Sequence, residues 1–307
     1  MVYMKTLNTG KALAVAAGVI LTSSFAIADA AEGEGFSFTP GKGISYGEQQ
    51  IVSAEVGVGF DSKYMTYGVI DGKDPIATLS GKLTFFDWVY VALDAQYDLT
   101  KTNGRRGGYG NRAGKYTLLD TSIGIAHEFD LGETIGTLGV DASYMYEYLP
   151  RYHGEVGDTQ YLNLELTLDG HWIEPTFTFE RDLMADEGTY VNLNLGHTFT
   201  LVGDEEDQVL TFKPSIGQGA GNSLRTKGYF GETSDGYNHG GLMDTTIMGE
   251  FEWAVCDWLS LGAYVAYYDY IFDSKMRDAA RAYNSEWGSG CHDSYNVVWG
   301  LSLTAKF

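Results

Sequence analysis

Basic residues, prolines and cysteines are scarce in this chain of 307 residues, which has only 5 Pro and 2 Cys. Lys and Arg together number 20 against 41 Asp and Glu, so the formal net charge is −21. Nucleic-acid binding needs a basic surface that neutralises phosphates, and this charge argues against such a partner. Beyond residue 31 no apolar run approaches the roughly 20 residues of a membrane-spanning helix, which excludes helical insertion.

The two cysteines, Cys256 and Cys291, would by default form a disulfide in an exported chain. Cys256 falls in a short connection and Cys291 at the end of a long one, on opposite sides of the membrane in the topology predicted below. A spanning strand would separate their α-carbons by about 25 Å, whereas a disulfide needs less than about 7 Å. We therefore expect two unpaired thiols within the chain.

The first residues have the pattern of a secretory signal peptide, which we assign to 1–30. Lys5 and Lys11 form a weakly basic start, residues 12–21 are apolar, and Ala28-Asp29-Ala30 is a small-x-small cleavage site. A cut after Ala26-Ile27-Ala28 and a retained signal anchor are the alternatives.

The segment that follows, 31–50, is Gly-rich and acidic without sustained alternation. We expect a periplasmic lead-in there, and a barrel domain over 51–307.

From residue 51 onward, apolar and polar residues alternate in about a dozen segments. In the last one, Tyr295, Val297 and Trp299 begin one parity, while Asn296 and Gly300 lie on the other. A period of two predicts an extended strand with one apolar and one polar face. The predicted strands lie at 52–60, 77–85, 89–99, 119–129, 138–148, 162–168, 173–179, 191–199, 210–216, 243–253, 259–270 and 294–307. The facing of 259–270 is open, because both of its parities are apolar.

The last segment ends on Phe307 without a polar tail. This ending resembles the final strand of bacterial outer-membrane β-barrels, where a terminal aromatic residue belongs to the signal for the assembly machinery. A sheet that faces lipid must close on itself, because an open edge in hydrocarbon leaves backbone groups unpaired. The predicted fold is therefore all-β: a transmembrane, antiparallel, up-and-down β-barrel of about 12 strands.

Short and long connections alternate between these strands. The short ones lie at 86–88, 130–134, 169–170, 202–208 and 256–258, and the long ones at 61–75, 100–115, 149–158, 181–188, 217–241 and 272–293. This alternation is typical of outer-membrane barrels with tight periplasmic turns and longer outer loops. Aromatic residues fall near both ends of the strands, as two interfacial belts would require. Trp88, Trp172, Trp253 and Trp258 lie toward the short turns, and Tyr97, Tyr146, Tyr148 and Tyr267 toward the long loops.

The polar parity of the strands is strongly acidic. Charges on the lipid face would cost about 2–4 kcal/mol each at mid-depth, so the barrel interior is their expected place. The predicted pore-lining residues are Glu55, Lys82, Asp94, Asp98, Asp120, Asp141, Glu165, Lys213, Glu250 and Glu252, and Glu128, Glu147, Glu174, Glu180, Asp244 and Lys306 share their parity. Carboxylates around a water-filled lumen attract cations. The alternative is an ordinary polar interior whose acids pair with loop arginines.

Basic residues gather instead in one Gly-rich outer loop, 100–115. They are Lys101, Arg105, Arg106, Arg112 and Lys115. The loop lacks the strand–helix setting of a phosphate-binding loop. It could bind lipopolysaccharide phosphates, fold inward onto the acidic wall, or remain a solvated loop.

Enzymatic and metal sites have little support, and we expect no catalytic residues, no metal and no cofactor. The six histidines are scattered, and none has the i, i+2 spacing that would aim two at one metal. His127 or His197 beside a Ser would be needed for a lipid-modifying hydrolase. The acidic turn 204–207 lacks the ligand spacing and Gly of a calcium loop.

A family resemblance enters at the first long connection. Ser62-Lys63-Tyr64-Met65-Thr66-Tyr67-Gly68, followed by Asp74-Pro75, is similar to the opening of the TorF-type porins, which have a Ser-x-Tyr-x-x-Arg-Gly turn and a downstream Asp-Pro. Tyr67 stands where those proteins have Arg, so no role of that Arg is carried over. The match spans roughly 25 residues together with the layout and the terminal Phe. The resemblance implies an outer-membrane barrel with porin activity and no particular substrate.

Together these patterns predict a porin in the outer membrane of a Gram-negative-type envelope, reached by signal-peptide export. It would be a passive channel for small hydrophilic solutes that prefers cations, with outer-membrane lipid and the assembly machinery as its other partners. The rival from another class is a non-conducting structural or adhesive barrel that binds a partner or glycan through its outer loops.

Overall fold

The computed structural model describes residues 36–307, apart from 48, 101–114, 133, 150–157, 171, 204–207, 232–238 and 288–290. The predicted signal peptide, the start of the lead-in and the acidic turn 204–207 therefore lie outside the described residues. So do four of the five predicted basic-loop residues, namely Lys101, Arg105, Arg106 and Arg112.

Strands dominate the described chain, with two helices in its long connections. The strands are β1 (Phe36–Thr39), β2 (Gly43–Tyr46), β3 (Gln49–Asp61), β4 (Tyr64–Thr66), β5 (Val69–Gly72), β6 (Ile76–Phe85), β7 (Val89–Asp98), β8 (Lys115–Asp130), β9 (Thr137–Tyr148), β10 (Thr159–Asp169), β11 (Glu174–Asp182), β12 (Thr189–Gly196), β13 (Phe199–Gly203), β14 (Gln208–Gly221), β15 (Gly241–Cys256), β16 (Leu259–Asp269) and β17 (Asn296–Lys306). The helices are α2 (Ser223–Phe230) and α3 (Ser274–Trp287).

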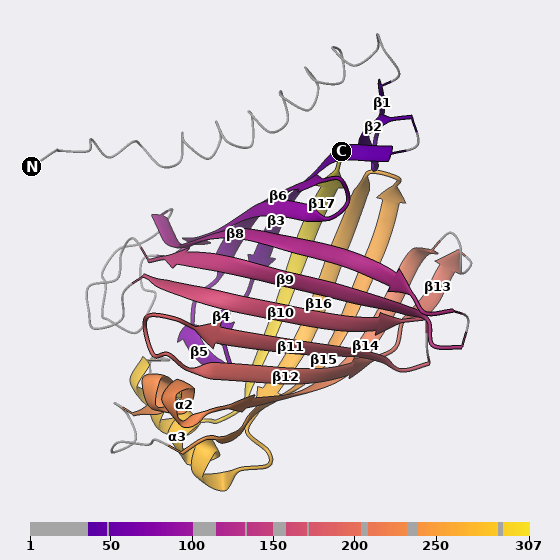
Figure 1. Cartoon of the computed structure of the whole chain (residues 1–307). Coiled ribbons are helices and arrows are strands. Elements are labelled where there is room, and N and C mark those ends of the chain that lie inside the picture. Colours follow the sequence, from indigo (N-terminus) through magenta and orange to yellow (C-terminus); the bar gives the residue numbers. More distant parts are fainter. Residues whose placement is uncertain are drawn as a thin grey trace, which may run out of the picture.

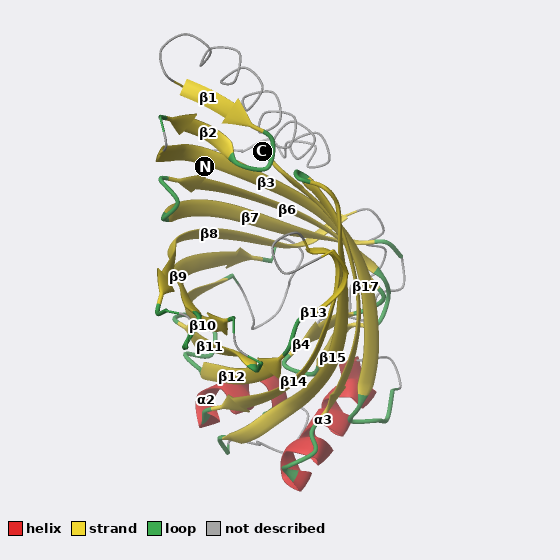
Figure 2. Ribbon diagram, turned by 90° about the vertical axis from the view of Figure 1, so that its right-hand side faces the viewer, coloured by secondary structure: helices red, strands yellow, loops and turns green. Residues whose placement is uncertain are grey.

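Twelve strands of the described chain close into one antiparallel barrel (Figures 1 and 2). Around the barrel they run β3, β17, β16, β15, β14, β12, β11, β10, β9, β8, β7 and β6, and β6 pairs again with β3. At the seam, Ala54 and Phe307 exchange two backbone hydrogen bonds of 2.7 Å. The predicted fold class and strand number are confirmed.

Two features of the barrel sheet depart from the predicted strands. The strand expected over 191–199 is interrupted after Gly196, and β12 and β13 pair separately with β14. At the interruption, the Thr198 amide and hydroxyl both donate to the Glu174 carboxylate, at 3.0 and 2.8 Å, in place of a strand partner. The second departure is the lead-in, where β1 and β2 extend the sheet beside β3, although no alternation predicted strands there.

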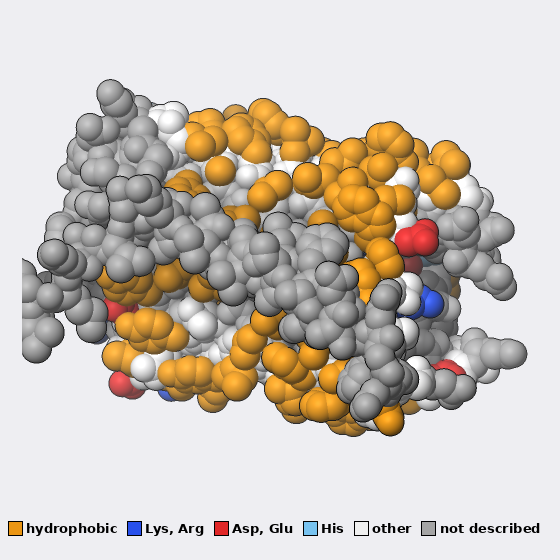
Figure 3. Space-filling model, turned by 90° about the horizontal axis from the view of Figure 1, so that it is seen from above, with side chains coloured by type: hydrophobic (Ala, Val, Ile, Leu, Met, Phe, Trp, Pro, Cys, Tyr) orange, Lys and Arg blue, Asp and Glu red, His pale blue; other side chains and the backbone are white. Residues whose placement is uncertain are grey.

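The two faces of the barrel wall have opposite character. Large apolar side chains are exposed on its outside, among them Ile123 at 55 % and Leu301 at 54 %, and Figure 3 shows apolar side chains over much of the described part of one side. The open question about 259–270 is resolved, because Leu261 and Val265 are exposed outside while Ser260 and Tyr264 line an internal cavity. An apolar outer surface of this kind is what hydrocarbon requires of a barrel.

The two helices lie at the end of the barrel that carries the long connections (Figure 1). Asn222 caps α2 by accepting from the Arg225 amide at 3.0 Å, and Asp273 caps α3 by accepting from the Met276 amide at 3.1 Å. Such side-chain acceptors satisfy amides that have no partner within the helix. Neither helix has the length and apolar character that crossing a bilayer demands, as far as the described residues show.

Candidate functional site

The first long connection folds inward as a β-hairpin, β4–β5. Its two-residue turn is Tyr67-Gly68, with φ of 46° and 81°. Positive φ at both positions is the type I′ turn that suits the twist of a hairpin. Gly adopts positive φ freely, whereas for a residue with a side chain, such as Tyr67, this conformation is less favourable by about 1–2 kcal/mol. The contacts of Tyr67 must therefore hold it there.

Those contacts reach the far side of the barrel. The Tyr67 hydroxyl donates to Glu180 Oε1 of β11, and its ring packs on Tyr190 of β12 with centroids 4.5 Å apart. In the strand order, β11 and β12 lie halfway round the barrel from β3 and β6, which carry the hairpin. Burial raises the pKa of the Tyr67 phenol well above its usual range, so the phenol stays protonated and remains a donor. The hairpin thus spans the mouth of the barrel.

Further hydrogen bonds fix the hairpin to α3 and to the end of β16. Asn284 accepts from the Ile70 amide at 3.0 Å, and the Tyr283 hydroxyl donates to Asp71. Tyr270 donates its hydroxyl to the Tyr67 carbonyl. The hairpin is therefore held from three directions.

One side of the mouth, between the hairpin and β12–β17, is filled by a hydrophobic cluster. Its buried members are Val69, Tyr190, Phe230, Met243, Tyr270, Met276, Ala279, Ala280 and Tyr283, with Tyr67 and Tyr229 packed against them. Met276, Ala279, Ala280 and Tyr283 fall on one face of α3 at the i, i+3, i+4, i+7 spacing of an amphipathic helix. The helix thereby packs against the hairpin on this side.

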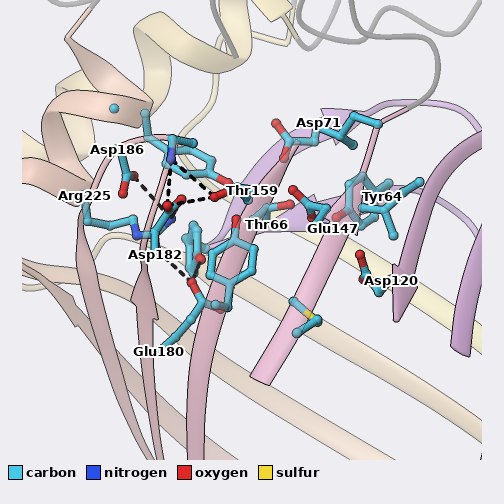
Figure 4. Close-up of a pocket in the computed structure, with 18 of the residues that line it drawn as sticks. Tyr64, Thr66, Asp71, Asp120, Glu147, Thr159, Glu180, Asp182, Asp186 and Arg225 are labelled. Carbon is cyan, nitrogen blue, oxygen red and sulfur yellow. Dashed lines mark hydrogen bonds and ion pairs between the residues drawn. The ribbon is translucent and has the colours of Figure 1, made fainter. Parts of the chain in front are cut away.

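The other side of the mouth contains a cavity of about 410 Å³. Its wall comes from β8, β9, β10 and β11, and the hairpin and α2 form its opposite side (Figure 4). The ionisable residues that line it are Asp71, Asp120, Glu147, Glu180, Asp182, Asp186 and Arg225, and tyrosines 64, 67, 161, 229 and 283 complete it.

Arg225 forms ion pairs with one group of these acidic residues. The guanidinium is 1 % exposed, lies 2.9 Å from Glu180 and 3.2 Å from Asp186, and has Asp182 at 4.0 Å. Asp182 also accepts from the Thr159 hydroxyl at 2.8 Å and from two amides of the following turn. A buried charge needs such pairing to offset its lost hydration. The three carboxylates of this group are paired with the guanidinium, although Arg225 Nε has no hydrogen-bond partner among the described residues, and the pairing holds α2 on β11.

A second group, at the other side of the cavity in Figure 4, has no cation. Asp71, Asp120 and Glu147 form no ion pair with any described residue. Asp120 is the direct cross-strand neighbour of both Glu147 on β9 and Asp94 on β7. Like charges at such positions repel each other. A cation or water close to them would relieve that repulsion.

Deeper in the barrel two further cavities lie against the inner wall. One, of about 570 Å³, is lined by residues that include Lys213, Glu250, Glu252, Tyr264 and Thr304. The other, of about 460 Å³, is lined by residues that include Glu128, Asp141, Glu165 and Thr167.

Most of the predicted pore-lining residues line one of these three cavities, namely Asp120, Asp141, Glu165, Lys213, Glu250 and Glu252. Lys306 Nζ is 3.9 Å from Glu55 Oε2, and Lys82 Nζ lies 4.1 Å from the centre of the Tyr90 ring. Lys213 Nζ is 3.0 Å from Glu174 Oε2. The interior therefore mixes a few paired bases with many acids.

Asp98 differs from the other predicted residues because its exposed fraction is 0 %. It lies at the mouth end of β7 and is enclosed by its surroundings, so it contacts no lumen space in the described part of the chain. Lys115, from the predicted basic loop, begins β8, and its side chain lies outside the described residues.

The histidines that an enzyme would need occupy unremarkable places. His127 stacks on Trp88 with ring centres 3.8 Å apart, and His197 packs edge-on against Phe199. Ser285 and His292 are hydrogen-bonded at 3.0 Å, but His292 is exposed and has no carboxylate partner among the described residues. The described residues likewise contain no group of three or more His, Cys, Asp or Glu placed to hold a metal.

Cys256 and Cys291 are both free. Cys256 ends β15 at a short turn, and Cys291 follows α3 in the last long connection.

Comparison with known proteins gives distant structural likenesses. No protein-family model matches the chain, and no curated protein matches it. Among solved structures, the KdgM porin shares 8 % identity over 82 % of this chain and 99 % of its own, with a TM-score of 0.45. The NanC porin shares 10 % sequence identity with this chain, over 83 % of this chain and 100 % of its own, with a TM-score of 0.47. The COG4313 outer membrane channel from Pseudomonas putida F1 shares 9 % sequence identity, over 84 % of this chain and 96 % of its own, with a TM-score of 0.47. Similarities this distant assign no solute and no family, and the TorF-type resemblance stays a prediction.

Proposed function

We propose that this chain is an outer-membrane porin, a passive diffusion channel for small hydrophilic solutes that prefers cations. The observation that carries the proposal is the contrast between the two faces of the closed barrel. Apolar residues are exposed outside, and carboxylates line cavities of about 410, 460 and 570 Å³ inside. A barrel needs an apolar exterior only in hydrocarbon, and a polar, cavity-bearing interior suits an aqueous path.

Cation preference follows from the charge of the interior. Lys82 packs on Tyr90, and Lys213 and Lys306 each approach a carboxylate, whereas Asp120, Asp141, Glu147 and Glu165 have no ion pair with any described residue. A lumen with this imbalance concentrates cations and repels anions.

The test is conductance of the purified barrel in planar lipid bilayers. We expect open-channel steps, and in a salt gradient a reversal potential of the sign that a cation-preferring channel gives. A reversal potential of the opposite sign would contradict the carboxylate mechanism. The absence of any channel would contradict the porin assignment.

A non-conducting structural or adhesive barrel is the second candidate. The hydrophobic cluster that fills one side of the mouth favours it, because a fully closed mouth would present a packed outer surface to a partner or glycan. Silent bilayers together with glycan or protein binding would support this candidate.

A further inference from the structure

The mouth of the barrel is unequally divided, and the division points to where selectivity arises. The hairpin β4–β5 crosses from β3 and β6 to β11 and β12, so it separates the mouth into two sides. On the side of β12–β17 the mouth is filled by the buried cluster, whereas the cavity of about 410 Å³ lies on the side of β8–β11. A solute that enters through the described part of the mouth meets this cavity first.

We propose that the β4–β5 hairpin is the constriction of the channel and that Asp71, Asp120 and Glu147, which line the cavity beside it, are its cation-selecting residues. The inference rests on the proposed channel function and adds the place where charge is discriminated. It concerns monovalent cations and small organic amines, for which carboxylates replace part of the hydration shell.

The first argument is charge that the protein leaves uncompensated. Glu180, Asp182 and Asp186 are paired with Arg225, but Asp71, Asp120 and Glu147 have no ion partner among the described residues. Asp120 Oδ1 is also out of contact with solvent and accepts no hydrogen bond from any described residue. The uncompensated charge of these three carboxylates attracts cations into the cavity that they line.

The second argument is the rigidity of the constriction. A selective opening needs a fixed width, and the hairpin is fixed by Tyr67 on Glu180, by Asn284 on the Ile70 amide and by Tyr283 on Asp71. Gly68 closes tightly on β15, since a Cβ at that position would lie 2.5 Å from the Asp244 Cβ. The Tyr283 bond also orients Asp71, which otherwise would be free to turn.

The third argument is the tyrosine surface of the same cavity. Of the five tyrosines that line it, Tyr64, Tyr67 and Tyr229 are partly exposed, whereas Tyr161 and Tyr283 are buried. Aromatic faces attract cations when water is partly excluded, and the structure already shows this, with Arg225 5.0 Å above the Tyr67 ring. An organic amine would therefore find both a carboxylate and a ring in reach.

The test compares carboxylate-to-amide variants at the constriction with matched variants deeper in the barrel. Asp71→Asn and Asp120→Asn/Glu147→Gln remove charge beside the hairpin, and Glu250→Gln/Glu252→Gln removes the same charge from the cavity of about 570 Å³. Potassium chloride gradients across a planar bilayer give the cation-to-anion permeability ratio. We expect the constriction variants to lower that ratio by about three- to tenfold, given the strength of focused fields in clefts. The deeper pair should change it by less than about twofold, because wider, hydrated spaces screen charge more fully.

The outcomes separate this inference from the proposed function. A conducting wild type whose ratio responds to the deeper pair and not to the constriction variants would overturn the inference and leave the porin assignment intact. Wild type and variants that are all silent would overturn the porin assignment itself. Migration of the unheated barrel in a detergent gel shows that each variant is folded.

A second measurement locates the constriction by the block of conductance that a bulky group produces. In a chain with Cys256→Ser and Cys291→Ser, the Glu147→Cys variant is treated with a cationic methanethiosulfonate during recording. We expect the conductance to fall by more than half, and the same reagent on the Glu252→Cys variant to have a smaller effect. Equal block at both positions would contradict a constriction at the hairpin.

Discussion

The Tyr67 hydroxyl, at the turn of the β4–β5 hairpin, donates a hydrogen bond to the carboxylate of Glu180, which lies on the opposite wall of the barrel. Tyr67 makes this bond from a left-handed backbone conformation, with φ of 46°. Strained residues of this kind persist only where the surroundings over-determine them. Here the surroundings are the rings of Tyr190 and Tyr229 and the carboxylate itself. The turn is therefore a docking point and not a passive connection.

Two substitutions at position 67 should distinguish the backbone strain of the turn from the contacts of the Tyr67 side chain. Tyr67→Asn suits the type I′ turn and relieves about 1–2 kcal/mol of strain, but it removes both the ring and the hydroxyl. Tyr67→Phe retains the ring and removes only the hydrogen bond, leaving Glu180 with Arg225. We expect larger fluctuations of the single-channel current in both, and more in Tyr67→Asn. If neither variant differs from wild type, the hairpin is not held by Tyr67.

Loss of the Arg225 guanidinium should destabilise the mouth strongly. Arg225→Met would leave Glu180, Asp182 and Asp186 together without a cation, at a cost of about 3 kcal/mol or more. The measurement is denaturant unfolding of the barrel in lipid vesicles. The matched control is Arg281→Met, because Arg281 is half-exposed and, among the described residues, pairs only with the exposed Asp278 on α3. Surface pairs of that kind contribute between zero and about 1 kcal/mol.

A compensating change sharpens that prediction. Adding Asp182→Asn to Arg225→Met removes one of the stranded charges, so part of the lost stability should return. A double variant as unstable as the sum of its parts would show that the packing of Arg225 on Tyr67 and Tyr161, and not its charge, matters.

Neighbouring residues on β17 test the facing of the wall. Leu301 is 54 % exposed on the outside, and Ser302 lines the cavity of about 570 Å³ on the inside. Leu301→Arg should cost about 2–4 kcal/mol of folding free energy in lipid vesicles if its depth is near the bilayer centre. Ser302→Arg should cost less than half of that, because the added charge reaches water. Equal costs would contradict lipid contact at Leu301.

The two free thiols report the orientation of the barrel. Cys256 lies at a short turn and Cys291 in a long connection. In intact cells a polymer-linked maleimide, too large to pass an outer-membrane channel, should label Cys291 and leave Cys256 unlabelled. After lysis it should label both, since Cys256 is exposed. Labelling of Cys256 in intact cells would reverse the assigned sidedness.

Alternation along the chain predicted the barrel well, because lipid on one side and water on the other impose a period of two on every strand. It could not predict β4–β5, whose residues meet neither lipid nor a continuous strand partner and depend on distant contacts such as Glu180 and Asn284. The helix α3 could have been found, since Met276, Ala279, Ala280 and Tyr283 repeat at helical spacing. The interruption at Thr198 could not have been predicted, because it involves a hydrogen bond to Glu174 on another strand.

The proposed cation-selecting residues can be identified only in part from the sequence. Asp120 belonged to the predicted acidic parity, and Glu147 shared it. Asp71 lies in a connection, where periodicity carries no information about facing. Likewise, nothing in the spacing of the sequence shows that Arg225 neutralises Glu180 and Asp186 and leaves the other carboxylates uncompensated.

The seam between Ala54 and Phe307 has a kinetic consequence. Every other neighbouring pair in the barrel joins strands that follow one another closely in the chain, but β3 and β17 are separated by nearly its whole length. Pairings of such high contact order form slowly. Ring closure is therefore expected to be the last event of assembly, and until it occurs two unpaired edges are available for aggregation with other chains.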